Sequence, residues 1–139
     1  MATKTVEVAG KTLAFESGTL AKQADGSACV RLGDSILLAT AVSASPREGI
    51  DFFPLLVDFE AKMYAAGKIP GTRYIRREGR PAESSILIGR RIDRSIRPLF
   101  PEGYRDEVQV VVTPLSADPE NPLDAIGIVP ASTALMISS

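Results

Sequence analysis

The strongest constraint on the fold is an uninterrupted apolar run in the first third of the chain. Residues 36–42 read Ile-Leu-Leu-Ala-Thr-Ala-Val, with Thr40 as the only polar side chain, and the turn pair Gly33-Asp34 lies just before them. A short apolar run beside a turn signal is typical of a strand in the interior of a protein. Because polar alternation is absent, residues 35–43 predict a central strand covered on both faces.

The segments around this run carry strand and helix signals in a definite order. Further strands are predicted over residues 5–8, 11–16, 27–32, 52–60 and 107–115. Helices are predicted over residues 81–97, with Pro81 in the first turn, and over the largely apolar residues 123–138. This order indicates an α+β fold, in which helices pack on one face of a mixed sheet.

The chain of 139 residues is expected to form one domain. Residues 61–80 have weak periodicity and several glycines, which predicts a functional loop. The sequence ends within an apolar helical pattern, so we expect residues 1–139 to be an incomplete domain.

Several classes of function are excluded by composition. The chain has no histidine, which excludes Ser-His-Asp and Cys-His catalysis. Cys29 is the only cysteine, so no internal disulfide forms and a buried structural thiol is expected. No apolar run approaches 18 residues and the first ten residues lack a secretory signal, so we expect no membrane span and a cytoplasmic location.

The near-neutral net charge of −1 hides one concentrated basic segment. Residues 73–97 hold eight basic and three acidic side chains, a local balance of +5 that leaves −6 on the remainder. All eight bases are arginine, although the chain has five lysines elsewhere. The guanidinium group binds phosphate through two parallel hydrogen bonds. Such a local cluster indicates a polyanion site.

On the predicted helix the apolar and basic residues occupy different sides. Ile88, Ile92 and Ile96 form one stripe, and Arg90, Arg94 and Arg97 lie roughly opposite. Asp93 is spaced to pair with Arg97 at i, i+4. This face is either a solvated surface with ion pairs or a phosphate-binding surface. The arginines of the preceding loop favour phosphate binding.

Four consecutive sequence blocks resemble a known family. IDFFPLLVDFE, YAAGKIPG, IRREGRP and IGRRIDRSIRPLFPEGY lie in this order between residues 50 and 104, and DEVQVVVTPLSAD follows. They are similar to the N-terminal core of polynucleotide phosphorylases. The resemblance implies a ribonuclease PH-like fold and a 3′→5′ phosphorolytic exoribonuclease that releases nucleoside diphosphates from single-stranded RNA. It also implies a homotrimeric ring, contacts with other RNA-degradation proteins, and inorganic phosphate as co-substrate.

The resemblance also implies roles for individual residues. The family's loop usually reads Phe-Phe-Arg-Arg, and the matching residues here are Tyr74, Ile75, Arg76 and Arg77. Tyr74 is then expected to stack on a base, although packing within the loop is the alternative. The loop 61–80 and the helix 81–97 are the expected RNA-facing segment. The expected RNA-binding or phosphate-binding residues are Tyr74, Arg76, Arg77, Arg80, Arg90, Arg94 and Arg97.

The same resemblance places catalysis outside this chain. In the family, phosphorolysis and the Mg²⁺ or Mn²⁺ site are credited to a second core. We therefore expect no catalytic residue and no metal ligand here, and no activity from the 139-residue chain alone. The alternatives are a non-catalytic RNA-binding or ring-building subunit of the ribonuclease PH family, ribonuclease PH itself, or a module that binds an acidic protein.

Overall fold

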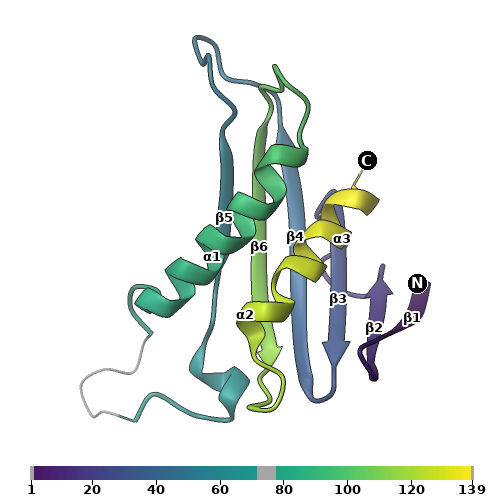
Figure 1. Cartoon of the computed structure of the whole chain (residues 1–139). Coiled ribbons are helices and arrows are strands. Elements are labelled where there is room, and N and C mark those ends of the chain that lie inside the picture. The colour runs from purple at the N-terminus through teal and green to yellow at the C-terminus, as the bar shows by residue number, and fades with distance from the viewer. Residues whose placement is uncertain (1, 72–77, 139) are drawn as a thin grey trace.

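The computed structural model describes residues 2–71 and 78–138, and within them one mixed sheet of six strands carries its helices on one side (Figure 1). The strands are β1 (Ala2–Val8), β2 (Lys11–Ser17), β3 (Gly26–Leu32), β4 (Ser35–Ala44), β5 (Leu55–Phe59) and β6 (Glu107–Ser116). Their order across the sheet is β1-β2-β3-β4-β6-β5. All neighbours are antiparallel except β5 and β6, which run parallel. The predicted α+β class is confirmed.

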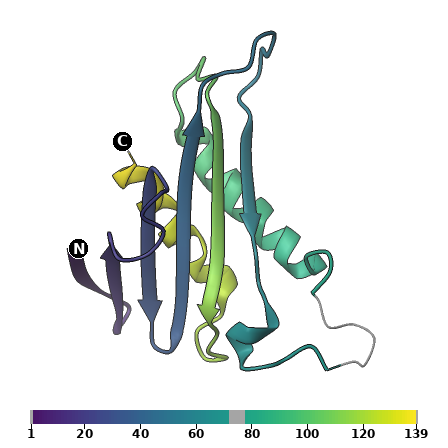
Figure 2. The same cartoon turned by 180° about the vertical axis from the view of Figure 1, so that it is seen from behind.

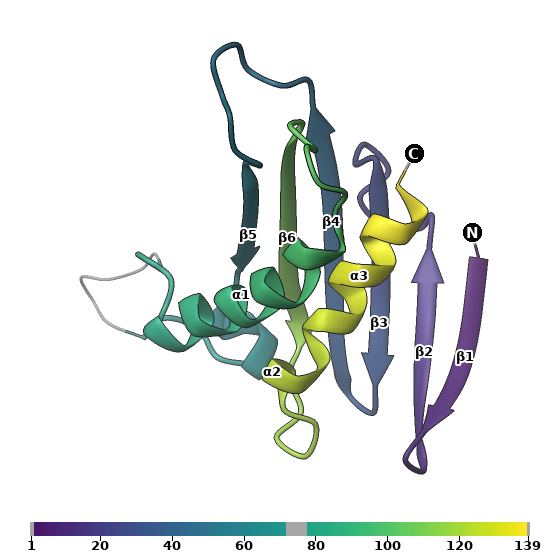
Figure 3. The same cartoon turned by 45° about the horizontal axis from the view of Figure 1, so that its top comes forward.

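The helices pack on this sheet in two groups. They are η1 (Met63–Ala66), α1 (Glu83–Ile96), η2 (Arg97–Leu99), α2 (Leu123–Ile126) and α3 (Ile128–Ile137). In Figure 3, α3 lies in front of β3 and β4, and α1 crosses the side of the sheet that ends in β5. Among the helices of the described residues, none is both long and apolar enough to cross a membrane.

The prediction of a central strand covered on both faces is half right. β4 lies between β3 and β6, and Leu37, Ala39 and Ala41 are buried on its helix side. On the other face Val42 is 44% exposed, and Figure 2 shows this face with no helix over it. The apolar pattern persists there because cross-strand neighbours shield it partly, as Cys29 and Thr113 do for Leu38.

The helix predicted over residues 123–138 is divided in two. α2 ends at Ile126 and α3 begins at Ile128, with Gly127 between them. Pro130 has no N–H to donate to the carbonyl of Ile126 four residues earlier, so a regular helix cannot run through this point. Gly127 also packs tightly, since a Cβ there would stand 3.2 Å from the Cδ1 atom of Ile92. The missing N–H of Pro130 therefore accounts for the break, and the close approach of Ile92 accounts for the glycine at position 127.

The two edges of the sheet differ. β1 forms one edge, and all seven of its residues are exposed. β5 forms the other edge, and α1 packs along it. Helix α1 buries Ile92 and Ile96 in the core, which places the opposite side of the same helix in solvent.

Candidate functional site

The exposed side of α1 carries the arginines that the sequence predicted to lie there. Ile92 and Ile96 are buried and Ile88 is half-buried, whereas Arg90 and Arg94 are exposed, which confirms the predicted division for these residues. Arg97, predicted on the same side as Arg90 and Arg94, instead lies in η2 just after the helix. Arg90 and Arg94 contribute to a surface depression of about 390 Å³. The other lining residues are Leu87, Arg91 and Ser95.

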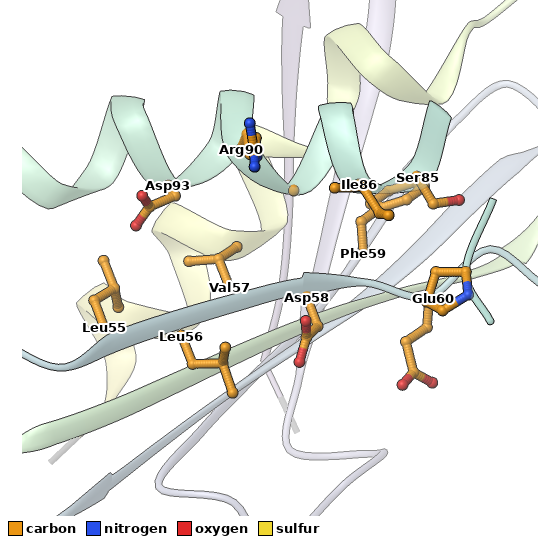
Figure 4. A pocket seen from close by; sticks show the side chains of 12 residues that line it. Leu55, Leu56, Val57, Asp58, Phe59, Glu60, Ser85, Ile86, Arg90 and Asp93 are labelled. Atoms are coloured by element: carbon orange, nitrogen blue, oxygen red, sulfur yellow. The ribbon is translucent and has the colours of Figure 1, made fainter. Parts of the chain in front are cut away.

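A second hollow lies between α1 and the edge strand β5 (Figure 4), with a volume of about 460 Å³. Its lining combines apolar residues of β5 with Ser85, Arg90 and Asp93 of the helix. In Figure 4 the side chain of Asp93 points toward β5, whereas Asp58 extends from the opposite side of the strand. Arg90 therefore lies where two hollows meet, beside both the outer depression and the groove.

Arg97 has a different environment from Arg90 and Arg94. Its Nη2 atom lies 2.8 Å from Oδ1 of Asp93, which confirms the predicted i, i+4 pair. Nη1 donates to the carbonyl of Phe53 at 3.3 Å, and Nη2 donates to the carbonyl of Leu55 at 3.1 Å. The guanidinium carbon also lies 5.8 Å from the centre of the Phe53 ring. The structure thus directs Arg97 toward β5 and the segment before it.

Aromatic side chains hold the end of α1 near Arg97. The ring centres of Phe53 and Phe100 are 4.6 Å apart, and that of Tyr104 lies 5.3 Å from Phe53. Burial, together with the charge of Asp106, raises the pKa of the Tyr104 hydroxyl. Two of the sequence blocks described above, IDFFPLLVDFE and IGRRIDRSIRPLFPEGY, meet in this cluster.

Two of the four arginines between residues 90 and 97 form ion pairs and two do not, as far as the described part of the chain extends. Arg91 pairs with Asp124 at 3.0 Å and Arg97 pairs with Asp93. Within residues 2–71 and 78–138, neither Arg90 nor Arg94 forms an ion pair. Of the four arginines between residues 90 and 97, these two therefore keep their guanidinium groups free of ion pairs within the described residues.

The loop before α1 is described only at its ends. Tyr74, Arg76 and Arg77 lie outside the described residues, so their predicted roles stay predictions. Arg80 is exposed just before the helix. Glu78 accepts a hydrogen bond from the Met63 amide, which ties the chain before α1 to η1, a short helix that the sequence pattern did not predict.

Two contacts of the site lie between residues far apart in the chain and were not predicted from the sequence. The contacts of Arg97 with Phe53 and Leu55 join residues 44 and 42 positions apart, and no local pattern encodes them. Gly89 lies against β5, because a Cβ there would stand 3.3 Å from the carbonyl oxygen of Val57. A glycine in the middle of an amphipathic helix is itself a signal of close packing, and it could have indicated this contact.

The described residues offer no site that fits a divalent metal. Asp58, Glu60 and Asp93 border the groove, but no group of three or more metal-binding side chains is gathered anywhere in residues 2–71 and 78–138.

Comparison with known proteins identifies the fold and its relatives. Residues 9–139 match the family described as "3′ exoribonuclease family, domain 1". The chain belongs to the 3′ exoribonuclease family. The predicted ribonuclease PH-like fold is confirmed by this match, and the resemblance to polynucleotide phosphorylases is confirmed by the relatives below.

Relatives of this family member share more than half of its residues. A polyribonucleotide nucleotidyltransferase of Thermomicrobium roseum is 57% identical over 136 residues, which are 97% of this chain and 17% of the relative. One of Koribacter versatilis is 61% identical over 130 residues, which are 93% of this chain and 16% of the relative. The chain thus spans less than a fifth of the length of these relatives.

Solved structures show the same fold at lower identity. The Archaeoglobus fulgidus exosome with RNA bound to the active site matches with a TM-score of 0.68 and 24% identity, over 97% of this chain and 52% of that chain. An archaeal exosome core matches with a TM-score of 0.61 and 22% identity, over 97% of this chain and 49% of that chain. At these identities the likeness concerns the fold.

Proposed function

We propose that this chain is the N-terminal part of a 3′→5′ phosphorolytic exoribonuclease, a polyribonucleotide nucleotidyltransferase, in which residues 61–97 hold single-stranded RNA by its phosphates. Two findings support this function. Relatives that are 57% identical to this chain are named polyribonucleotide nucleotidyltransferase. The arginines of α1 also face solvent on the side away from the core.

The observation that carries the RNA-binding role is the placement of Arg90 and Arg94. They are one helical turn apart, which separates them by about 6 Å along the axis. Both are exposed, and neither is ion-paired within the described part of the chain. Two guanidinium groups at this spacing can bind neighbouring phosphates of an extended strand through charge-assisted hydrogen bonds. Arg80 extends the same basic surface beyond the start of the helix.

The loop residues complete this surface in the proposal. Arg76 and Arg77 add phosphate contacts, and Tyr74 supplies a ring on which a base stacks. Stacking of this kind tolerates any base, because every base has a π-face. The segment would therefore grip RNA with little sequence preference.

The reaction of the whole protein defines what this segment contributes. An oxygen of inorganic phosphate attacks the last phosphodiester phosphorus, the bond to the preceding 3′ oxygen breaks, and that oxygen takes up a proton as the nucleoside diphosphate leaves. A divalent metal, Mg²⁺ or Mn²⁺ held outside this chain, would stabilise the charge that develops on the phosphate oxygens. Residues 61–97 neutralise phosphates upstream of that bond and keep the strand in place.

The assembly and location follow from the same proposal. The whole protein forms a homotrimeric ring in the cytoplasm and works with other RNA-degradation proteins. A non-catalytic RNA-binding or ring-building subunit is the alternative. Incubation of the 139-residue chain with RNA and phosphate should release no nucleoside diphosphate, and release would overturn the placement of catalysis outside this chain.

Salt-dependent binding of labelled homopolymeric RNA tests the phosphate contacts. Each phosphate contact contributes about 0.7 to the slope of log affinity against log salt for a single strand. We expect Arg90→Gln with Arg94→Gln to lower the slope by about 1.4, twice that contribution. The control is Arg31→Gln, which removes one positive charge, half of the charge lost in the double variant, from an exposed site on the sheet face that has no helix over it. An unchanged affinity and slope in the double variant would reject the proposed RNA surface.

A further inference from the structure

We propose that Arg97 supports RNA binding as a positioning residue, by holding Asp93 and the segment that leads into β5, and that it makes no phosphate contact of its own. This inference rests on the proposed function of the same helix. It distinguishes Arg97 from Arg90 and Arg94, with which it shares a face in the sequence pattern.

The donors of Arg97 are engaged inside the molecule. Nε lies 3.1 and 3.2 Å from the two carboxylate oxygens of Asp93, and Nη2 makes a third contact with the same carboxylate. Nη1 and Nη2 also donate to the carbonyls of Phe53 and Leu55. All three nitrogen atoms of the guanidinium group therefore have internal acceptors, and a phosphate contact would have to compete with them.

The pairing of Arg97 with Asp93 protects the charge of the RNA surface. Asp93 stands three residues after Arg90 and directly before Arg94. A carboxylate released at this position would be spaced to pair with Arg90 at i, i+3. It would also repel an approaching phosphate. By holding Asp93 in an ion pair, Arg97 leaves Arg90 free for RNA.

Arg97 also fixes the helix relative to the edge of the sheet. The carbonyl of Leu55 belongs to the edge strand β5, and the Phe53 ring lies beneath the guanidinium group. Gly89 brings α1 against Val57 of the same strand. Two separate contacts thus hold α1 on β5, and the direction in which Arg90 and Arg94 project depends on them.

Comparison of Arg97→Lys with Arg97→Gln separates positioning from phosphate binding. Lysine keeps the charge but has no planar fork to bridge a carboxylate and two carbonyls. We expect both variants to weaken RNA affinity about threefold to fivefold, the size expected when an exposed ion pair is lost. Because a released Asp93 would occupy Arg90, the salt slope of Arg97→Gln should fall by up to about 0.7 and should return to its original value when Asp93→Asn is added. A lysine variant that binds like the original protein, or a lowered slope in the glutamine variant that Asp93→Asn does not restore, would overturn the positioning role.

A double-mutant cycle with Asp93→Asn distinguishes the positioning role from a general loss of stability. A general loss would change RNA affinity equally with and without the Asp93 carboxylate. In the original protein Asp93→Asn should change RNA affinity little, because the carboxylate is already paired. In the Arg97→Gln background the same change should recover at least threefold in affinity, because it removes a released carboxylate. Equal effects of Asp93→Asn in both backgrounds would overturn the proposal.

These experiments distinguish failure of the proposed RNA binding by Arg90 and Arg94 from failure of the positioning role of Arg97. If Arg90→Gln with Arg94→Gln leaves RNA affinity unchanged, the proposed function of the helix fails. If that pair weakens binding but the cycle shows no coupling between Asp93 and Arg97, only the positioning role of Arg97 fails. Far-ultraviolet circular dichroism and the urea midpoint, compared across all variants, keep loss of folding separate from loss of binding.

Discussion

Gly89 on α1 lies against the carbonyl oxygen of Val57 on β5, at a distance that leaves little room for a side chain. A Cβ at Gly89 would stand 3.3 Å from that oxygen and 3.6 Å from the amide nitrogen of Phe59. Both partner atoms belong to the backbone of the edge strand, so they cannot rotate away. The glycine thus sets how closely the basic helix approaches the sheet.

Substitution of Gly89 tests this contact. In an unhindered helix, alanine would be more stable than glycine by about 1 kcal/mol. We expect Gly89→Ala not to raise the free energy of unfolding, because the close contact cancels this advantage of alanine. We expect Gly89→Val to lower the free energy of unfolding by about 2 kcal/mol through overpacking. Urea denaturation measures both. Ser84→Ala, at an exposed position of the same helix, serves as the control for propensity alone. Stabilisation by both Gly89 variants would show that the helix does not depend on close packing here.

Gly26 at the start of β3 makes a tighter approach to α3. A Cβ at this position would overlap the backbone carbonyl oxygen of Ala134. We expect Gly26→Ala to lower the free energy of unfolding by about 3 kcal/mol, since strand and helix must separate to admit the methyl group. Gly71→Ala is the matched control, because its Cβ would meet only an ordinary contact at 3.7 Å. Equal denaturation midpoints for the two variants would contradict the prediction.

Ser35 joins the turn before β4 to the loop after β6. It is fully buried, donates to the carbonyl of Asn121 at 3.0 Å and accepts from the amide of Asp118 at 2.9 Å. Ser35→Ala would leave both groups without this partner, and we expect a loss of about 1–3 kcal/mol in the free energy of unfolding. Ser45→Ala in the exposed loop after β4 should change stability little. A Ser35 variant as stable as the Ser45 variant would exclude this role.

Asp118 should make stability depend on acidic pH. The backbone amide of Glu120, followed by the side chain of Asn121, holds the pKa of the Asp118 carboxyl below its usual value. The stabilising contribution is therefore complete above the unfolded pKa of about 3.9, and it is lost as the pH falls through the lower pKa of the folded state. The difference in denaturation midpoint between the original protein and Asp118→Asn should stay constant between neutral pH and the unfolded pKa of about 3.9. It should then shrink as the pH falls further, through the pKa of the folded state. A constant difference throughout would contradict the assignment.

Local patterns were sufficient for most of the individual elements. The hairpins were predictable because Gly10 and Gly33 mark their turns, and both adopt a positive φ. The Ile and Arg periodicity gave α1 its buried and exposed sides. The place of β5 was not predictable, since it lies next to β6 and parallel to it, with Leu55 opposite Val108. That pairing joins segments separated by the whole of α1, and it depends on packing of the complete sheet.

The candidate site was predictable in composition but not in the role of each arginine. Spacing alone groups Arg97 with Arg90 and Arg94. Its internal role depends on Phe53 and Leu55, which tertiary structure brings to the end of the helix. The break between α2 and α3 had a local signal in Pro130, but an apolar pattern that continues across Gly127 concealed it.

The two edges of the sheet differ in how free they are to pair with a further strand. Along β5 the outward carbonyl of Leu55 already has a donor in Arg97, and α1 lies against Val57. At β1 no strand of the described chain pairs with the outer side of residues 2–8. A free strand edge is a template for another chain. A strand added beside Ala2–Val8 would lie at the far end of the sheet from the basic helix, so lengthening the sheet there would leave the arginine surface open.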